Sequence, residues 1–377
     1  MPRLLPILDL DRFEQGGLAR RTFLYDLRSA AREIGFFYLG GHGIPQAQVQ
    51  NLLAEARRFF ALPEAEKRAI EMVNSAQFRG YTRAGGERTK GQADWREQLD
   101  FGVERETIPQ RPGTPAWTRL QGPNLWPASL PGLRPAVLSW QAGVTAVAIR
   151  LLKAFALSLE QPEDAFEPIY GGTPNHRMKI VRYPGRDLTG GDQGVGAHKD
   201  GGFLTLLLQD ENRGLQVDYG GSWIDADPIP GTFVVNIGEL LELASNGYLR
   251  ATVHRVVTPP AGVERYSVPF FFSARLDAEI PLLELPPELA AQAPGPASDP
   301  DNPLLRNVGA NVLKSRLRSH PDVAQRNYPD IVGAAVAKMS SEARGTCRRP
   351  LSRRRRRPIS VRGRTPQALY AETGLRK

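Results

Sequence analysis

The feature that most constrains the fold is a series of short apolar segments in the centre of the chain, each ended by turn residues. The segments lie at residues 178–184 (MKIVRYP), 203–209 (FLTLLLQ), 214–218 (GLQVD), 232–237 (TFVVNI), 254–258 (HRVVT) and 266–272 (YSVPFFF). Gly, Pro, Asp and Asn separate them at fairly even spacing, which is typical of a β-sandwich or jelly roll. We therefore expect an α+β, mainly β, fold whose core is a jelly roll, that is, a double-stranded β-helix.

The N-terminal part of the chain has a different pattern. Apolar residues recur at helical spacing over residues 22–33, 46–60 and 136–160, whereas the short runs at 5–10 and 36–39 indicate strands. We expect these helices to buttress the jelly roll. Residues 79–135 are rich in Gly, Pro and Trp and are expected to form extended loops.

These patterns divide the chain into an N-terminal helical and loop region (1–135), a jelly-roll catalytic region (136–330) and a basic tail (331–377). The net charge of +9 belongs to the tail. Residues 338–377 hold thirteen Lys and Arg and two Glu, so this segment carries +11 and the remainder −2. Five consecutive arginines (353–357) repel one another, so the tail is expected to be disordered. Nucleic-acid contact is therefore expected of the tail at most.

A single cysteine, Cys347, excludes an internal disulfide and a cysteine-based metal cage. No apolar run approaches the roughly 18 residues of a membrane span. Asp9 and Asp11 interrupt the start of the chain before the apolar core of a signal peptide could form. We expect a cytoplasmic protein, a monomer, with no membrane contact.

Three residues form a candidate metal site. His198 and Asp200 stand two positions apart at a predicted strand end, so their side chains are expected to point to the same face. His254 begins a later strand candidate and can supply a third ligand. Two histidines and one carboxylate leave other metal positions open, which is the ligand set of a non-haem Fe(II) oxygenase. Zinc accepts the same ligands, so the ligand types alone do not distinguish the two metals.

A second pair of residues lies on the next predicted strand. Arg265 and Ser267 are also two positions apart, and a guanidinium with a hydroxyl can bind a carboxylate in bidentate fashion. Beside a three-ligand iron, such a pair indicates a dicarboxylate co-substrate such as 2-oxoglutarate.

Several ordered motifs carry a family resemblance. They lie at residues 35–45 (GFFYLGGHGIP), 179–184 (KIVRYP), 198–200 (HKD), 214–217 (GLQV), 236–238 (NIG), 254–256 (HRV) and 265–267 (RYS). Over residues 4–330 the chain resembles the 2-oxoglutarate-dependent Fe(II) dioxygenases of the isopenicillin N synthase-like group. The resemblance implies that His198, Asp200 and His254 bind iron, that Arg265 and Ser267 hold the distal carboxylate of 2-oxoglutarate, and that Tyr183 hydrogen-bonds this co-substrate.

The expected reaction is oxidation of a small organic substrate by dioxygen, with hydroxylation as the default outcome and release of succinate and carbon dioxide. Two alternatives stay open at this point. An Fe(II) oxidase of the same fold would use no 2-oxoglutarate, and Arg265 would then bind the carboxylate of the substrate itself. A non-catalytic binding protein would contact nucleic acid through the basic tail.

Four other residues carry smaller expectations. His42 is expected to cap or pack the turn that contains it, and His176 and His320 are expected at the surface. Arg182 replaces a neutral residue of the resembled motif, so it is expected to place a charge near the pocket and to favour acidic substrates.

Overall fold

The computed structural model describes residues 5–172, 174–297 and 303–332 of the 377-residue chain. The chain divides into two compact units, Met1–Pro329 and Asp330–Lys377. Nearly all of the second unit, including the five-arginine run and the expected disorder of the tail, lies outside the described residues. The helices and strands from Ile7 to Asn327 all belong to the first unit.

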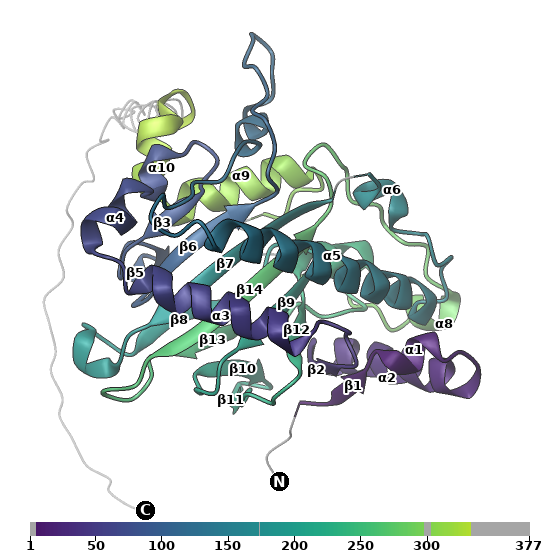
Figure 1. Ribbon diagram of the computed structural model, residues 1–377. Coiled ribbons are helices and arrows are strands. Elements are labelled where there is room, and N and C mark those ends of the chain that lie inside the picture. Colours follow the sequence, from purple (N-terminus) through teal and green to yellow (C-terminus); the bar gives the residue numbers. More distant parts are fainter. Residues whose placement is uncertain (1–4, 173, 298–302, 333–377) are drawn as a thin grey trace, which may run out of the picture. The chain divides into compact units, whose positions relative to one another are not determined.

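Two sheets form the core of this unit (Figure 1). The large sheet has the strand order β1 (Ile7–Asp9), β2 (Phe36–Gly40), β12 (Phe233–Ile237), β9 (Leu204–Gln209), β14 (Arg265–Ser273), β7 (Asn175–Tyr183), β6 (Glu97–Gly102) and β3 (Gly80–Thr82). The small sheet has the order β11 (Ser222–Asp225), β10 (Leu215–Tyr219), β13 (His254–Val257) and β8 (Gln193–His198). Only β1 and β2 pair in parallel within these two sheets; the other pairs are antiparallel.

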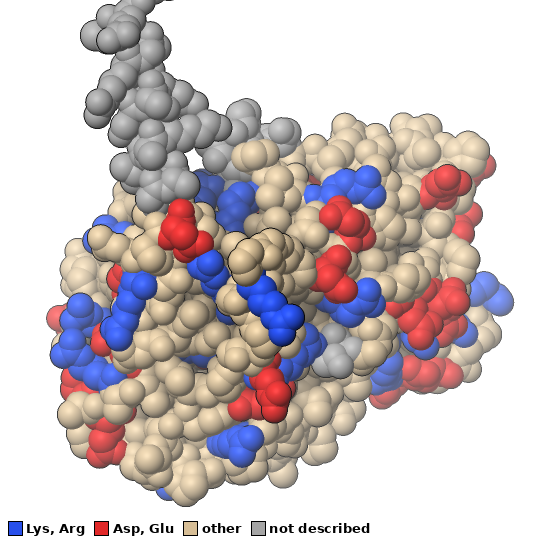
Figure 2. Space-filling model, turned by 90° about the horizontal axis from the view of Figure 1, so that it is seen from above, with Lys and Arg blue, Asp and Glu red and all other residues tan. Residues whose placement is uncertain are grey.

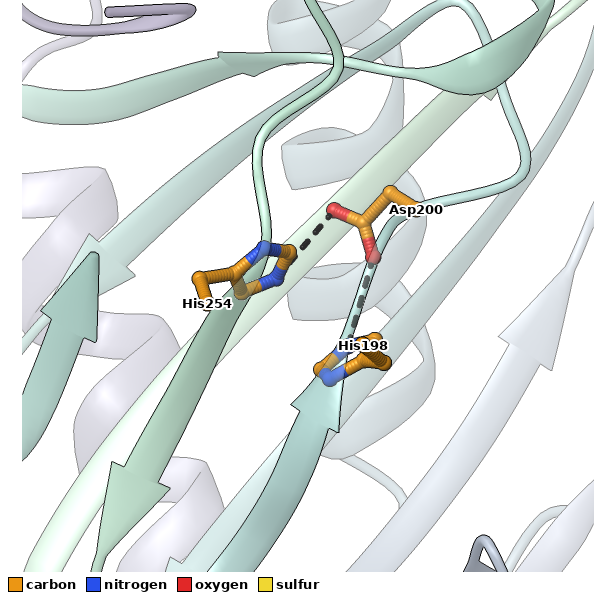
Figure 3. A group of neighbouring side chains, drawn as sticks. All are labelled: His198, Asp200 and His254. Carbon is orange, nitrogen blue, oxygen red and sulfur yellow. Dashed lines mark ion pairs between the residues drawn. The ribbon is translucent and has the colours of Figure 1, made fainter. Parts of the chain in front are cut away.

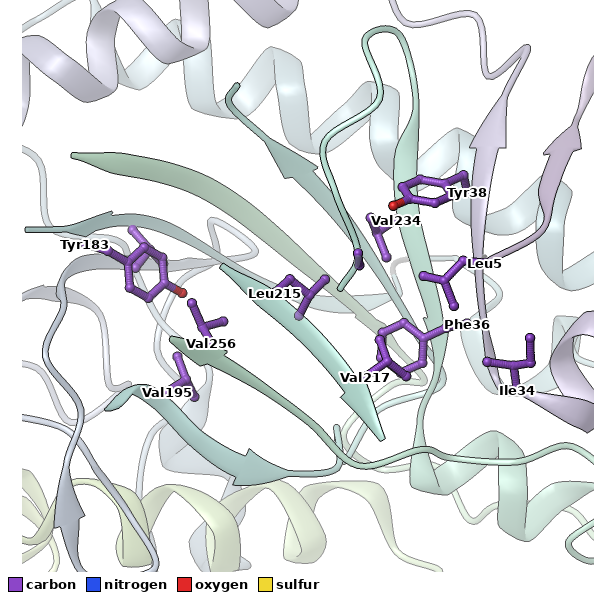
Figure 4. Packing of buried hydrophobic residues seen from close by; sticks show 12 residues of the cluster. Leu5, Ile34, Phe36, Tyr38, Tyr183, Val195, Leu215, Val217, Val234 and Val256 are labelled. Carbon is purple, nitrogen blue, oxygen red and sulfur yellow. The ribbon is translucent and has the colours of Figure 1, made fainter. Parts of the chain in front are cut away.

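An apolar cluster contains side chains from both sheets (Figure 4). Its members are Leu5, Ile34, Phe36, Tyr38, Val181, Tyr183, Val195, Leu215, Val217, Ala226, Val234 and Val256. Val181 and Tyr183 on β7 are two positions apart, so the residues that alternate with them face away from the cluster. The arrangement is the expected jelly roll, and the cluster defines which side of each strand faces its interior.

Helices accompany the sheets. They are α1 (Asp11–Glu14), α2 (Gly17–Glu33), α3 (Gln46–Phe60), α4 (Glu64–Ala69), α5 (Leu133–Ser158), α6 (Glu167–Tyr170), α7 (Glu239–Ala244), α8 (Pro287–Ala290), α9 (Val308–Ser319) and α10 (Pro321–Asn327), with 3₁₀ turns at Met72–Asn74, Ala116–Leu120 and Arg186–Leu188. The predicted helix at 46–60 coincides with α3. Figure 1 shows α3 and α5 crossing one face of the large sheet, where α5 contacts α3, β14 and β9.

Helix α5 is long and apolar enough to cross a membrane by length and composition, and it is the one such helix among the described residues. Its packing accounts for this composition. Val137, Trp140, Val144 and Leu151 are buried, with exposures of 1% or less. The helix therefore has the apolar character of a core helix that packs against α3 and the large sheet.

The structure corrects the expectation of loops over residues 79–135. β3 and β6 form one edge of the large sheet, and all six residues of β6 are buried. The sequence of β6 hid this strand because Glu97 and Asp100 interrupt the apolar pattern. Their partners are distant in sequence: Lys67 lies 2.9 Å from Glu97, and Arg316 lies 3.0 Å from Asp100.

Charge is mixed on the surface of the described residues in the view of Figure 2, where basic and acidic side chains are interspersed. This face carries no extended region of a single sign among the residues drawn in colour. The picture agrees with the small net charge of the chain outside its tail.

Candidate metal centre

The small sheet brings the three predicted metal-ligating residues together (Figure 3). His198 is the last residue of β8 and His254 the first of β13, and the two are direct partners across these antiparallel strands. Asp200 Oδ1 lies 3.6 Å from His198 Nε2, and Asp200 Oδ2 lies 3.8 Å from His254 Nε2. One ligand atom from each residue falls within 4.8 Å of the others, a spacing that a single metal ion can bridge.

The position of Asp200 differs from the expected one. β8 ends at His198, so Asp200 lies on the following loop rather than on the strand. Its carboxylate reaches the histidines because the loop turns back over them, as Figure 3 shows. The predicted meeting of the two side chains is therefore correct, but the alternation of a strand is not its cause.

Backbone carbonyls orient both imidazoles. His198 Nδ1 lies 2.8 Å from the Gly196 oxygen, and His254 Nδ1 lies 3.1 Å from the Thr252 oxygen. A carbonyl can only accept a hydrogen bond, so each Nδ1 donates to its carbonyl and each Nε2 is the nitrogen left to face the metal position. This is the tautomer that a metal ligand requires.

Two donors from the large sheet fix Asp200. The Thr205 hydroxyl donates to Asp200 Oδ2 at 2.6 Å, and the Asn236 amide donates to the same oxygen at 2.8 Å. The start of α7 holds the loop itself, since the backbone N–H of Glu239 donates to the Asp200 carbonyl at 2.8 Å. The carboxylate is thus positioned by side chains and its backbone by a helix.

The electrostatics of the cluster favour an ionised Asp200 beside a neutral His254; burial alone would lower the pKa of His198, but Asp200 raises it. Burial alone would raise the pKa of Asp200, but His254 and His198 hold it well below its usual range. Burial, with the charge of His198, lowers the pKa of His254 to about 4. An Asp carboxylate and a neutral His are the forms that bind a divalent metal.

Access to the metal position is uneven. The side chain of His198 is 33% exposed, whereas those of Asp200 and His254 are 5% and 9% exposed. The Phe36 ring packs edge-on against His254, with ring centroids 5.2 Å apart. The centre is therefore closed on the His254 side and open on the His198 side.

A buried guanidinium lies in the same interior. Arg265 has an exposure of 0%; its Nε donates to the Asn212 carbonyl at 3.2 Å and its Nη2 to Gln209 Oε1 at 2.7 Å. Its Nη1 is buried and has no hydrogen-bond partner among the described residues. Because a buried charged donor without a partner is costly, this atom fits a site for an anionic group.

Ser267 and Tyr183 surround this guanidinium. Ser267 follows Arg265 on the same face of β14 and is buried, while Tyr183 pairs with Arg265 across β7. The guanidinium carbon lies 4.9 Å from the centroid of the Tyr183 ring. A side chain at Gly214 would come within 3.2 Å of the Arg265 side chain, so glycine leaves room for it there.

Strand β9 connects the two clusters. Its inward residues Thr205 and Gln209 contact Asp200 and Arg265 respectively. Four residues of strand span roughly 13 Å. The metal position and Arg265 therefore lie along the same inward face of β9.

The other histidines have mixed outcomes. His42 caps its turn as predicted, because its Nδ1 accepts the backbone N–H of Ile44 at 3.0 Å. His176 and His320 are not at the surface; their exposures are 8% and 1%. His320 is covered by Arg316, one helical turn before it, and by Glu87, which is distant in sequence.

The expected role of Arg182 is also wrong. Arg182 alternates with the inward residues Val181 and Tyr183, so it faces away from the interior. Its guanidinium forms ion pairs with Glu97 and Glu264. Two carboxylates therefore neutralise this charge outside the pocket.

Sequence reasoning missed the residues that support the ligands. Thr205 and Asn236 are single polar residues within buried apolar strands, in the segments FLTLLLQ and TFVVNI. An isolated polar residue at a buried position needs a partner, and this is the signal that could have identified both. The carbonyls of Gly196 and Thr252 left no such signal, because any residue supplies a carbonyl.

Fold and site together are those of a metal-dependent oxygenase. The N-terminal residues 5–129 match the family described as non-haem dioxygenase in morphine synthesis N-terminal, and residues 174–274 match the 2OG-Fe(II) oxygenase superfamily. The chain is 36% identical over 359 residues to the 2-oxoglutarate-dependent dioxygenase frbJ of Dothideomycetidae sp. (strain 11243), covering 90% of this chain and 96% of the relative.

Two further proteins illustrate the relationship. The chain is 35% identical over 297 residues to the homoarginine-6-hydroxylase 2-ODD-C23.1 of Arabidopsis thaliana, covering 74% of this chain and 88% of the relative. The crystal structure of a full-length Neurospora crassa protein in complex with alpha-KG and 5-formyluracil superimposes with a TM-score of 0.65 at 25% identity, covering 82% of this chain and 95% of that chain.

The chain belongs to the 2-oxoglutarate- and Fe(II)-dependent oxygenase superfamily. It is an oxidoreductase that uses Fe(II), 2-oxoglutarate and dioxygen to oxidise a small organic molecule, with release of succinate and carbon dioxide. Neither alternative raised from the sequence gains support from the relatives.

Proposed function

We propose that His198, Asp200 and His254 hold the Fe(II) of this oxygenase and that Arg265, Ser267 and Tyr183 hold 2-oxoglutarate. The unpartnered Nη1 of Arg265 carries the second assignment. Among the described residues, two of the three nitrogens of this guanidinium donate hydrogen bonds, and the third, Nη1, is buried without a partner. One carboxylate oxygen can accept from Nη1 while the Ser267 hydroxyl donates to the other, so two charge-assisted hydrogen bonds would hold the carboxylate.

Bound Fe(II) and 2-oxoglutarate together supply the activation of dioxygen, and the protein supplies geometry and exclusion of water. The carbonyls of Gly196 and Thr252 keep both imidazoles in the ligating tautomer. Thr205 and Asn236 hold one carboxylate oxygen of Asp200. The apolar residues of the two sheets surround the centre, and the substrate enters on the His198 side, where the site is open. We propose hydroxylation as the reaction, in line with the relatives named hydroxylases.

The metal assignment is tested by anaerobic addition of Fe(II) and 2-oxoglutarate, which together give a visible metal-to-ligand absorption. Replacement of His198 by Ala should abolish this absorption and the coupled release of succinate. His42→Ala is the matched control, since it removes a half-buried imidazole that packs against Phe233 at 4.4 Å between ring centroids. A His198→Ala protein that keeps the absorption and turnover would show that the metal lies elsewhere.

The 2-oxoglutarate assignment has a separate test. Arg265→Gln removes the guanidinium from Tyr183 and Gln209, and we expect a Kd for 2-oxoglutarate that is higher by about tenfold or more, because a charge-assisted hydrogen bond is lost. The binding of Fe(II) alone should change little. An unchanged Kd for 2-oxoglutarate would place its distal carboxylate at another residue.

We further propose that the enzyme is a monomer that acts in the cytoplasm without membrane contact. The single cysteine and the buried apolar face of α5 support this proposal. Light scattering after size-exclusion chromatography should give a mass near 41.6 kDa, and a dimer mass would contradict it.

A further inference from the structure

A row of residues crosses the interior face of the large sheet beside the metal centre. In this row Arg177 on β7 pairs with Phe271 on β14, Phe271 with Thr205 on β9, and Thr205 with Asn236 on β12. Thr205 and Asn236 both donate to Asp200. Phe271 and Arg177 therefore extend the row of Asn236 and Thr205, the two residues that hold Asp200.

Arg177 lies at the opposite end of the interior from Arg265. Phe271 and Arg265 share one face of β14 and stand six residues apart, which is roughly 20 Å along the strand. Asp200 of the metal centre contacts Thr205 and Asn236, which lie in the same row as Phe271. The proposed 2-oxoglutarate site extends from the metal centre toward Arg265. Arg177 is thus positioned to contact a primary substrate rather than the co-substrate.

The guanidinium of Arg177 has no ion pair or hydrogen bond to any of the described residues. It lies against the Phe271 ring, whose centroid is 5.2 Å from the guanidinium carbon. Neighbouring arginines of the interior are more firmly held. Arg316 pairs with Asp100 at 3.0 Å, and the Arg79 guanidinium packs against Gly102, where a Cβ would meet it at 2.0 Å.

The carboxylates nearest to Arg177 are already engaged by other groups. The charged groups that act on it are Arg316 and Arg79, which repel it, and Asp100 and Asp200, which attract it. Asp100 already pairs with Arg316 and lies 3.7 Å from Lys179, and Asp200 belongs to the metal site. Burial, followed by the charge of Arg316, lowers the pKa of Arg177 to about 9. These carboxylates therefore leave the half-buried Arg177 guanidinium without an ion-pair partner among the described residues.

Part of the row that contains Arg177 and Phe271 is exposed to solvent on its inward side. Several inward-facing residues of the central strands are only half-buried, namely Arg177, Leu207, Pro269 and Phe271. His198 on the small sheet is half-buried as well. Fully packed positions on the same strands, such as Val181, have exposures near 0%. The half-buried side chains therefore border space that a ligand can enter next to the metal position.

We propose that the primary substrate carries a carboxylate that pairs with the Arg177 guanidinium, while the Phe271 ring packs against its apolar body. This inference rests on the proposed function, since it places the carboxylate beside the metal that oxidises the substrate. The unpaired charge favours an anionic group in the substrate.

The test compares benzoate, phenylacetate and 3-phenylpropionate with their neutral amides, which match them in shape. Each probe is titrated by calorimetry into the anaerobic protein loaded with Fe(II) and 2-oxoglutarate. We expect at least one carboxylate to bind about tenfold or more tightly than its amide, because a charge-assisted pair is formed. In Arg177→Gln this ratio should fall to about one.

Arg182→Gln is the matched control. It removes a guanidinium from the same strand, but from the outward face, where Glu97 and Glu264 hold it. This variant should keep the preference for the carboxylate. No carboxylate binding more tightly than its amide, or a preference that survives in Arg177→Gln, overturns the inference. The Fe(II)–2-oxoglutarate absorption is recorded in the same samples; its absence from the wild type would overturn the proposed function instead.

Stability gives a second test that needs no ligand. Arg177→Met removes an unpaired charge and keeps the length of the side chain, so the urea midpoint of the ligand-free protein should rise. Arg316→Met removes a paired charge and leaves Asp100 without its 3.0 Å partner, so its midpoint should fall. A fall of equal size in Arg177→Met would show that Arg177 is structural and would overturn the inference.

Discussion

Asp200 depends on the Thr205 hydroxyl more directly than on any other neutral group. The hydroxyl donates to Oδ2 at 2.6 Å and keeps that oxygen aimed along the direction of His254. Thr205→Val preserves the shape and removes the donor. We expect the affinity for Fe(II) to fall by roughly tenfold to a hundredfold, the usual cost of losing a residue that orients a metal ligand. Metal titration under anaerobic conditions measures this change.

Thr232→Val is the control for that substitution. Thr232 is a half-buried threonine whose hydroxyl donates to the Ile229 carbonyl at 2.9 Å, without any contact to the metal ligands. Its replacement should leave the metal affinity unchanged. Equal affinities for Thr205→Val and the wild type would mean that Asn236 alone suffices to hold the carboxylate.

At the scale of single residues, the sequence pointed to the three side chains that the structure brings together, but not to the residues that hold them. His198, Asp200 and His254 are chemically distinctive, and a chain with five histidines offers few combinations. The sequence did not predict a role for Arg177, because the proposed role depends on the absence of a counter-ion near its guanidinium among the described residues. A missing counter-ion is a property of the folded arrangement and has no local sequence pattern.

The loop between β8 and β9 owes its shape to the first turn of α7. The backbone N–H groups of Gly238 and Leu240 donate to the carbonyls of Phe203 and Gly202 at 2.9 and 3.0 Å. This close approach requires glycine at position 238, where a Cβ would lie 2.1 Å from the Gly202 oxygen. Gly238→Ala must therefore push the loop, with Asp200, away from the histidines.

We expect Gly238→Ala to lower the free energy of unfolding by about 1–3 kcal/mol, as overpacking does, and to weaken metal binding. Gly201→Ala is the control in the same loop, because its Cβ would meet only the Glu239 carboxylate at 3.7 Å, an ordinary contact. Chemical denaturation and metal titration of both variants check the prediction. Tight metal binding by Gly238→Ala would show that the loop adapts without moving Asp200.

A buried ion-pair cluster joins the segment before β6 to strand β7. Glu87 lies 2.7 Å from Lys179 and 2.7 Å from Arg96, and His320 lies 3.4 Å away. Burial alone would raise the pKa of Glu87, but Lys179, Arg96 and His320 hold it well below its usual range. The folded state thus binds the proton of Glu87 more weakly than the unfolded state does.

The stability that Glu87 contributes follows from this difference. It is fully present above the unfolded-state pKa of about 4.3 and is lost as the pH falls through the lower folded-state pKa. Glu87→Gln should lower the free energy of unfolding at pH 7 by about 3–5 kcal/mol, since Lys179 and Arg96 lose a buried partner. Between about pH 5 and pH 3, its stability should decline less steeply than that of the wild type.

Denaturation curves at several pH values measure both effects. Glu163→Gln is the control, because Glu163 is an exposed residue whose pair with Arg20 at 3.2 Å contributes about 0–1 kcal/mol. Parallel pH profiles for Glu87→Gln and the wild type would mean that other carboxylates account for the acid sensitivity.

At the scale of elements, the sequence predicted the helices and strands that bury apolar residues, but it did not predict a strand that buries ion pairs. α3 and the strands of the jelly roll follow hydrophobic periodicity, so their positions were visible in the sequence. β6 carries Glu97 and Asp100, and its charges are buried only because cations from α4, β7 and α9 reach them. Hydrophobic periodicity cannot reveal a strand that buries charged residues.

In the chain as a whole, the residues of the proposed site and the excess of positive charge lie in different segments. The metal centre and both proposed anion sites lie in the part of the chain with a net charge of −2, whereas residues 338–377 carry +11. The division between the two compact units falls at Pro329, before this basic segment begins. The family match at 174–274 also ends well before it. The basic segment is therefore not needed to build the site.

Deletion of residues 338–377 should consequently leave the catalytic unit intact. We expect the same thermal midpoint and the same Kd for 2-oxoglutarate, because no proposed ligand lies within the deleted segment. Binding of the full-length chain to DNA should weaken steeply with salt, as phosphate contacts by Lys and Arg do, and should disappear in the shortened chain. Differential scanning calorimetry and fluorescence anisotropy at several salt concentrations measure these quantities. A lowered thermal midpoint in the shortened chain would contradict the prediction for stability. DNA binding that persists in the shortened chain would assign this binding to the remaining residues, although acidic and basic side chains are interspersed on the face that Figure 2 shows.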